Sequence, residues 1–379
     1  MTVRSTSRAS AATREARVER MHASPRFDGR VFRNTGNASA GLKPGTVVPT
    51  MKEYICGGER RVPGAPLPLD DPRGAWRVAA ETGLRVTWLG HSTLLFEIDG
   101  ARILVDPVWT ARASPVPFAG PKRFHAPPVP ITALPALDAV LISHDHYDHL
   151  DRSAIRALNK RNVRFITSLG VGAHLESWGV APERITELDW WEQVTLEPSG
   201  VVITAAPSQH FSGRTLLDRN ATAWSSFHLQ GSKHSVFHGA DTGLTREYEQ
   251  VRDRFGRFDL VLLEIGAYHP AWGDIHLGPE HALEARLMLG SGTLLPIHWG
   301  TFNLAMHAWD QPIETLAAMA PGRGVTLLTP KLGQAVEPSR IEGVTPWWRG
   351  VVAAERAAAD GDGAAETSDD ESAVSWPVD

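Results

Sequence analysis

The chain has 379 residues, 42% of them hydrophobic and 21% charged, which is ordinary for a globular protein with a sizeable core. Its net charge of −5 gives no reason to expect nucleic acid as a partner. With the single cysteine Cys56, an intrachain disulfide and a metal site built from thiolates are excluded, so histidines and carboxylates must hold any metal.

Composition divides the chain into three segments. Residues 1–78 are predicted to be an N-terminal extension, partly disordered, because its start is rich in arginine and residues 60–75 are rich in proline and glycine. We expect a cytoplasmic protein, with peripheral membrane contact left open, because the chain shows neither a secretory signal nor a spanning apolar run. Residues 79–348 are expected to form the folded domain, and the acidic segment 349–379 a disordered tail.

The domain is expected to begin with strands at 85–89, 93–98 and 102–105, and Asp99-Gly100 predicts a type I′ hairpin between the last two. Further strands are expected at 137–143, 163–168, 194–197, 200–206, 222–229, 234–239, 259–265 and 292–298. Helices are expected after Asp151, from Leu244 to Gly256, from Pro279 to Gly290, and after Asp310. Hairpins followed by alternating strands and helices predict two mixed sheets covered by helices, a four-layer arrangement.

The strand at 137–143 runs into the sequence SHDHYDHLD, residues 143–151. His144 and His146 are two positions apart, so in extended backbone both side chains face the same side and can hold one ion. Asp148 and His149 follow where the chain turns toward the next helix, which aims them elsewhere. Two sets of ligands that face different directions favour a second ion a few ångströms from the first, as in two-metal hydrolases.

Three other predicted strands end close to side chains that bind metals. His210 follows the strand at 200–206, Asp241 follows the strand at 234–239, and His298 ends the strand at 292–298. Because sites are usually built in loops at the ends of buried strands, we expect these three side chains to join the histidine cluster. The set as a whole predicts a metal centre rather than a solvated loop.

The SHDHYDHLD segment resembles the HxHxDH signature of the metallo-β-lactamase superfamily. Within it, the chain resembles the N-acylphosphatidylethanolamine-hydrolysing phospholipase D family over about residues 80–335, in VTWLGHSTLLFEIDGARILVDPVW, ELDWWE, PSQHFSGRTLLDRNATAWSSF, GADTG and PIHWGTF. The resemblance implies an α/β fold, the αββα sandwich, with two zinc ions. It also implies which ligands hold which ion: His144, His146 and His210 the first, Asp148, His149 and His298 the second, with Asp241 bridging them. Manganese and iron accept the same ligands.

The expected reaction is hydrolysis of a phosphodiester by a metal-bridging hydroxide. Asp148 is a catalytic candidate that could orient the water, and His276 matches a substrate-side histidine of the resembled family. Asp145 is expected to orient histidine ligands, and His91 to have a structural role near the site. The segment YHPAWGD, residues 268–274, departs from the family and leaves the substrate in doubt.

These observations predict a dinuclear metal-dependent hydrolase, a phosphodiesterase of phospholipase D type that cleaves N-acyl phosphatidylethanolamine-like lipids. A lactonase acting on sugar-phosphate or acyl-homoserine lactones is the alternative on the same fold, because its substrate is another small ester that needs a metal hydroxide. A non-catalytic binding protein is the third hypothesis, and the complete ligand set argues against it. Whether the protein forms a homodimer is left open by the sequence.

Overall fold

The computed structural model describes residues 3–36, 38, 41, 43–215, 217–340 and 343–366. In this part of the chain, one sheet has seven strands in the order β13-β1-β2-β3-β4-β5-β6, and the other has six in the order β12-β11-β10-β9-β8-β7. The strands are β1 Leu84–Gly90, β2 Thr93–Ile98, β3 Ala101–Val105, β4 Ala139–Ile142, β5 Arg164–Ser168, β6 Ile185–Leu188, β7 Gln193–Leu196, β8 Val201–Ala206, β9 Ser226–Gln230, β10 Ser235–His238, β11 Leu260–Glu264, β12 Thr293–Ile297 and β13 Ala335–Val336. The α-helices are α1 Val3–Ala23, α2 Val47–Cys56, α3 Arg152–Asn159, α4 Gly172–Ser177, α5 Glu247–Phe255, α6 Gly278–Leu289, α7 Gln311–Met319 and α8 Trp347–Glu366.

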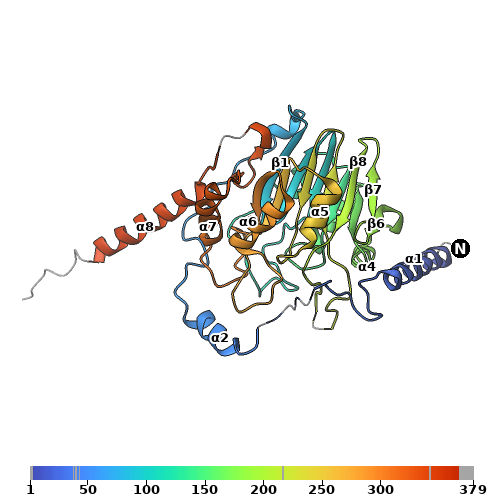
Figure 1. The fold of residues 1–379 in the computed structure, drawn as a ribbon, viewed down its shortest axis with the longest axis horizontal. Helices are drawn as coiled ribbons and strands as arrows, with labels where there is room; N and C mark the ends of the chain where they lie inside the picture. The colour runs from blue at the N-terminus through green and yellow to red at the C-terminus, as the bar shows by residue number, and fades with distance from the viewer. Residues whose placement is uncertain are drawn as a thin grey trace, which may run out of the picture.

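Each sheet is buried on both faces, and alternation along the strands decides which layer a side chain enters. In β2, Leu94 and Phe96 join the core between the sheets, whereas Leu95 joins the outer layer that contains Ile155 and Leu158 of α3. Helices α5, α6 and α7 cover the other sheet, and Figure 1 shows them in front of it. The predicted α/β fold, the four-layer αββα sandwich, is confirmed.

The predicted strands and helices are present with small shifts of their ends. Asp99 and Gly100 both have positive φ, 45° and 92°, as the predicted type I′ turn requires. The strand expected from 222 begins only at Ser226, because Thr222 and Trp224 instead bond to the loops at Asp145 and Ser208. The short strands β6 and β13 were not predicted, and neither was the six-residue helix α4.

The N-terminal extension is more ordered than the sequence predicts. Helix α1 carries no regular apolar stripe, and it is fixed to the domain by ion pairs of its arginines. Arg17 is buried and pairs with Glu176 and Glu187, the latter at 2.6 Å, while Arg20 pairs with Glu192 at 2.5 Å. Of the extension predicted to be partly disordered, Val3–Ala23 is thus a helix that ion pairs join to the domain.

The start of the predicted acidic tail is also helical. Helix α8 continues from the domain through Glu366, so residues 349–366 are not the disordered segment that we expected. Trp348 and Val351 are buried against the core, and Trp348 Nε1 donates a hydrogen bond to Glu314 at 2.7 Å, which anchors the helix. Residues 367–379, the rest of the predicted tail, lie outside the described residues.

Among the described residues, no helix combines the length and the apolar character that crossing a bilayer requires.

Candidate metal centre

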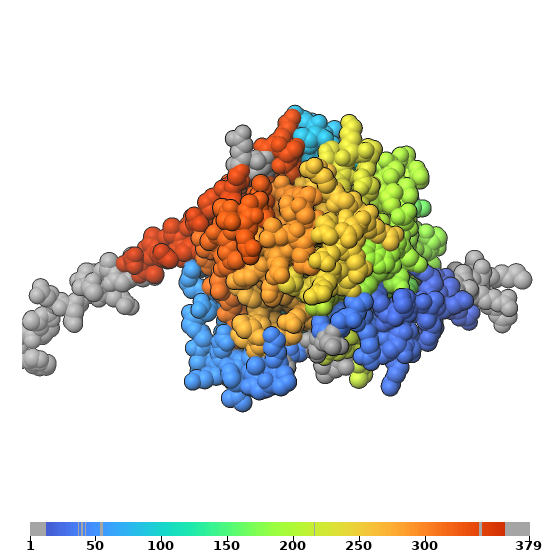
Figure 2. Space-filling model, viewed as in Figure 1, coloured from blue at the N-terminus to red at the C-terminus, as the bar shows by residue number. Residues whose placement is uncertain are grey.

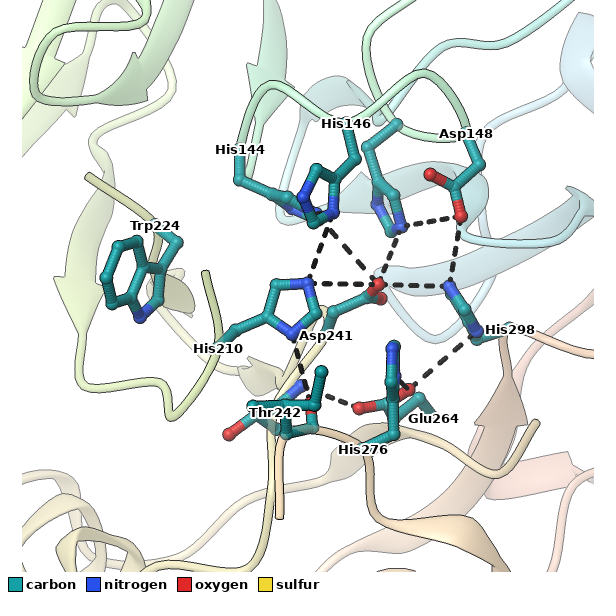
Figure 3. A network of polar contacts seen from close by, with 12 residues as sticks. His144, His146, Asp148, His210, Trp224, Asp241, Thr242, Glu264, His276 and His298 are labelled. Carbon is teal, nitrogen blue, oxygen red and sulfur yellow. Dashed lines mark hydrogen bonds and ion pairs between the residues drawn. The ribbon is translucent and has the colours of Figure 1, made fainter. Parts of the chain in front are cut away.

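The seven predicted ligands lie together at one edge of the two sheets, as Figure 3 shows for six of them by label. They come from the loops that follow four strands: β4 (His144, His146, Asp148 and His149), β8 (His210), β10 (Asp241) and β12 (His298). The chain turns sharply as it leaves these strands, with φ of 52° at Ala240 and 64° at His298, in the left-handed region that is costly for residues other than glycine.

Asp241 occupies the middle of the cluster. Its Oδ2 atom lies 3.1 Å from His149 Nε2 and 3.0 Å from His298 Nε2. The same oxygen lies 3.9 Å from His144 Nε2 and 3.7 Å from His210 Nε2. A carboxylate placed in this way can contribute to two ligand groups at once.

The remaining two ligands complete these groups. His146 Nδ1 lies 2.8 Å from His144 Nε2 and 3.2 Å from His210 Nε2. Asp148 Oδ2 lies 3.4 Å from His298 Nε2 and 3.7 Å from His149 Nε2. The structure thus brings together the sets that the family resemblance implies for two ions, although the ligand assignment itself remains a prediction.

The hydrogen bonds of the imidazoles fit metal ligation. Ser143 Oγ donates its only hydrogen to Asp106 at 2.7 Å, so at 2.9 Å it must accept a hydrogen bond from His144 Nδ1. His149 Nδ1 lies 2.8 Å from Asp106 Oδ2, and His210 Nδ1 lies 3.0 Å from the carbonyl oxygen of Ile275. Each of the three rings therefore carries a proton on Nδ1 and directs Nε2 toward the cluster.

Several of the presented atoms have no other partner. Within the described residues, His149 Nε2, His298 Nε2 and Asp241 Oδ1 are buried without a hydrogen bond. Leaving such polar atoms unsatisfied is costly, and divalent cations would satisfy all of them. The residues present, four nitrogen donors from buried histidines, one from the half-buried His146 and two carboxylates, fit a pair of zinc, manganese or iron ions.

The electrostatics differ between the two halves of the cluster. Burial alone would lower the pKa of His298, but Asp241 and Asp148 outweigh it and raise that pKa to about 10. Burial is likewise outweighed at His149, where Asp241 and its neighbouring carboxylates hold the pKa well above its usual value. Burial holds the pKa values of His144 and His210 well below the usual value, so these rings are neutral. Ligation by His149 and His298 must therefore release protons.

Two carboxylates that support the site were not singled out from the sequence. Asp106, fully buried after β3, accepts hydrogen bonds from the amide and hydroxyl of Ser143 as well as from His149. Glu264, fully buried at the end of β11, accepts from the Thr242 amide at 2.6 Å and lies 2.5 Å from His276 Nδ1. Both are carboxylates at the ends of apolar strands, and this position in the sequence could have identified them as candidate site residues.

His276 lies beside the cluster. Glu264 Oε2 fixes its Nδ1, and its ring lies 5.0 Å from the ring of His210 and 5.5 Å from that of His298, centroid to centroid. Burial, and the negative charge of Asp241, raise the pKa of Glu264, while His276 opposes that shift. The pair resembles the carboxylate–histidine pairs that hold an imidazole in one orientation.

The structure contradicts the expectation for Asp145, and the structural role expected for His91 stays a prediction. Asp145 forms no hydrogen bond to a ligand imidazole among the described residues; its carboxylate bonds instead to His174 at 3.2 Å, Thr222 at 3.0 Å and the amide of Gly213 at 2.7 Å. It fixes the loop instead. His91 Nε2 lies 2.9 Å from Asp148 Oδ2 and so orients a proposed ligand.

The unusual segment 268–274 lies next to the N-terminal extension. The amide of Gly273 donates to the carbonyl of Gly41 at 2.9 Å, and His269 Nε2 lies 3.0 Å from a carboxylate oxygen of Glu53 in α2. Further along, a Cβ atom at Gly243 would lie 1.9 Å from the carbonyl oxygen of Asp274, so glycine allows this loop to approach the GADTG turn.

Comparison with known proteins agrees with this description. A family model described as a beta-lactamase superfamily domain matches residues 101–299. An uncharacterised protein of Mycobacterium tuberculosis is 50% identical over 291 residues, which cover 76% of this chain and 77% of that protein. N-acyl-phosphatidylethanolamine-hydrolyzing phospholipase D 1 of Caenorhabditis elegans is 34% identical over 275 residues, covering 69% and 77%.

A solved structure shares the fold. The isothiocyanate hydrolase from Delia radicum gut bacteria matches 67% of this chain and 98% of that chain, with a TM-score of 0.54 and 22% sequence identity. The ligand cluster, the matched domain and these relatives lead to one conclusion. The chain belongs to the metallo-β-lactamase superfamily, as a metal-dependent hydrolase related to the N-acyl-phosphatidylethanolamine-hydrolysing phospholipases D.

Proposed function

We propose that the protein is a dinuclear phosphodiesterase of phospholipase D type that cleaves N-acyl phosphatidylethanolamine-like lipids. The observation that carries this proposal is the position of Asp241 between two ligand groups, with His276 held beside them. The Caenorhabditis elegans relative, at 34% identity, is named for this reaction and supports it.

Two divalent cations, when bound, would lower the pKa of a water molecule and neutralise charge on the reacting phosphate. The chain would supply the remaining functions. Asp148, which contacts His91, would hold the attacking water and pass a proton to the leaving oxygen. His276, oriented by Glu264, would donate a hydrogen bond from Nε2 to a phosphate oxygen when both of its ring nitrogens carry protons.

An apolar groove near the site suits a lipid chain. It has a volume of about 460 Å³ and is lined by Val47 and Met51 of α2, by Trp272, and by Leu304 and Met306, among others. Two loops that line it adjoin the metal centre, since one leads to His276 and the other begins after His298. Val47 and Met51 are 53% and 60% exposed, and apolar side chains exposed in this way support peripheral contact with a lipid surface. We propose that the protein is cytoplasmic and makes this contact from there.

A substrate panel tests the proposed function. The metal-loaded protein should hydrolyse long-chain N-acyl phosphatidylethanolamine in mixed micelles with a lower KM than a soluble chromogenic phosphodiester, because only the lipid fills the groove. It should leave acyl-homoserine lactones intact. Turnover of lactones without turnover of either diester would contradict the proposal and favour the lactonase.

His276→Ala should lower kcat for the diester by about 100-fold, since removing one preorganised hydrogen-bond donor costs about 10²- to 10³-fold. Metal content should stay at the wild-type value, because His276 is not among the proposed ligands. The matched control is His281→Ala, which changes an exposed histidine of α6, the helix that follows the loop of His276; this imidazole has no assigned role. A fall in metal content with His276→Ala would instead make His276 a ligand.

A further inference from the structure

The N-terminal extension reaches the metal centre through Asn34. The side-chain amide of this residue pairs with the main chain of His210 at two points. Asn34 Nδ2 donates to the carbonyl oxygen of His210 at 2.8 Å, and the amide of His210 donates to Asn34 Oδ1 at 3.0 Å. One planar side chain therefore satisfies both main-chain groups of a proposed ligand.

His210 needs such a partner because of its position in the chain. It lies four residues beyond the end of β8 at Ala206, outside the ladder of strand pairing. The residue itself is fully buried, so unpaired main-chain groups would be costly there. The amide of Asn34 takes the place of a neighbouring strand at this point.

Asn34 is itself fixed on the domain by the residues before it. Phe32 is fully buried against Leu169 and Trp224, and its amide donates to the carbonyl of Asn220 at 2.8 Å. Arg26, also buried, pairs with Asp189, and its guanidinium lies 3.8 Å from the ring centroid of Trp190. Figure 2 shows this dark blue segment packed against the green part of the domain.

We propose that Asn34 is a positioning residue for His210, and that the N-terminal extension contributes to metal binding through this contact. The imidazole of His210 is held at Nδ1 by Ile275, so its remaining freedom lies in the main chain that Asn34 fixes. The proposal rests on the metal centre of the proposed function, but it does not depend on the identity of the substrate.

The test is metal binding by Asn34→Ala, measured by competition with a chromophoric chelator, together with the visible spectrum of the cobalt-loaded protein. We expect one of the two ions to bind about 10-fold more weakly, because residues that orient metal ligands typically contribute about 10- to 100-fold to metal affinity. The visible absorption bands of the bound cobalt should shift as well. Asn34→Asp keeps the acceptor for the His210 amide but turns an oxygen toward its carbonyl, so it should be no better than alanine.

Two controls separate positioning from general stability. Phe32→Leu weakens the anchor of the extension but leaves the amide of Asn34 in place, and Arg30→Ala alters an exposed side chain of the same segment. Both should keep the wild-type affinities and cobalt spectrum. If Asn34→Ala does not fold, Asn34→Asp, which has nearly the same shape, carries the test.

Wild-type affinities and an unchanged cobalt spectrum in the folded Asn34 variants would overturn the proposal. So would equal loss of metal in Phe32→Leu at equal loss of stability, because the role would then be structural. A wild-type protein that binds no divalent ion would instead overturn the metal centre itself, and is distinguishable from both results.

Discussion

Asp241→Asn is expected to lower the hydrolysis of any phosphodiester by at least about 100-fold, the effect of removing one preorganised group that stabilises the transition state. Asp241 Oδ2 lies within 4 Å of ligand nitrogens from both halves of the proposed centre. An asparagine presents one neutral oxygen and an NH₂ group, which cannot neutralise two cations.

The loss should appear in metal content as well as in rate. With the shared carboxylate gone, we expect the variant to retain at most one ion per chain after gel filtration. Asp253→Asn, which changes an aspartate that is 68% exposed on α5, is the matched control and should keep both ions and the full rate. Turnover at the wild-type rate by Asp241→Asn would reject its role as the shared ligand.

Asp106→Asn is expected to weaken metal binding by about 10- to 100-fold, through a residue that touches no ion. The carboxylate accepts three hydrogen bonds, two from Ser143 and one from His149 Nδ1, all between 2.7 and 2.8 Å. An asparagine has one acceptor oxygen, so its NH₂ group must face a donor. Where it faces His149, the ring proton moves to Nε2, the atom that a cation needs.

The control for Asp106 is another aspartate–histidine pair, which joins the β2–β3 turn to the residue before β10. Asp99 Oδ1 lies 2.8 Å from His234 Nδ1, in the hairpin turn at the opposite end of β3 from Asp106. Asp99→Asn should cost stability comparable to that of losing a buried hydrogen bond, about 1–3 kcal/mol, without altering metal affinity. Equal effects of both substitutions on metal affinity would show that Asp106 acts only through stability.

The ligands could be predicted from the sequence because each lies at the end of a recognisable strand. The apolar runs before His144, Asp241 and His298 mark buried strands. Strands β8, β10 and β12 run in the same direction, so their C-terminal ends meet at one edge of their sheet. The alternation of β2 and the Asp99-Gly100 turn are equally local signals, so the layers of the sandwich were predictable. Assignment of ligands to ions needed the family resemblance.

What supports the ligands was harder to predict, because it depends on contacts between distant segments. Asn34 and His210 are 176 positions apart, and nothing near Asn34 in the sequence indicates its partner. Helix α1 was missed because its stabilisation comes from ion pairs with Glu176 and Glu187 rather than from an apolar stripe. Asp145 was misassigned because alternation predicts the side it faces, but not the partners it meets there.

The central claim is that one chain holds two divalent ions around Asp241, and elemental analysis of the purified protein tests it most directly. Protein prepared without chelators and supplied with zinc or manganese during expression should contain about two ions per chain, and Asp241→Asn at most one. Fewer than one ion per wild-type chain, or two ions in both proteins, would contradict the account.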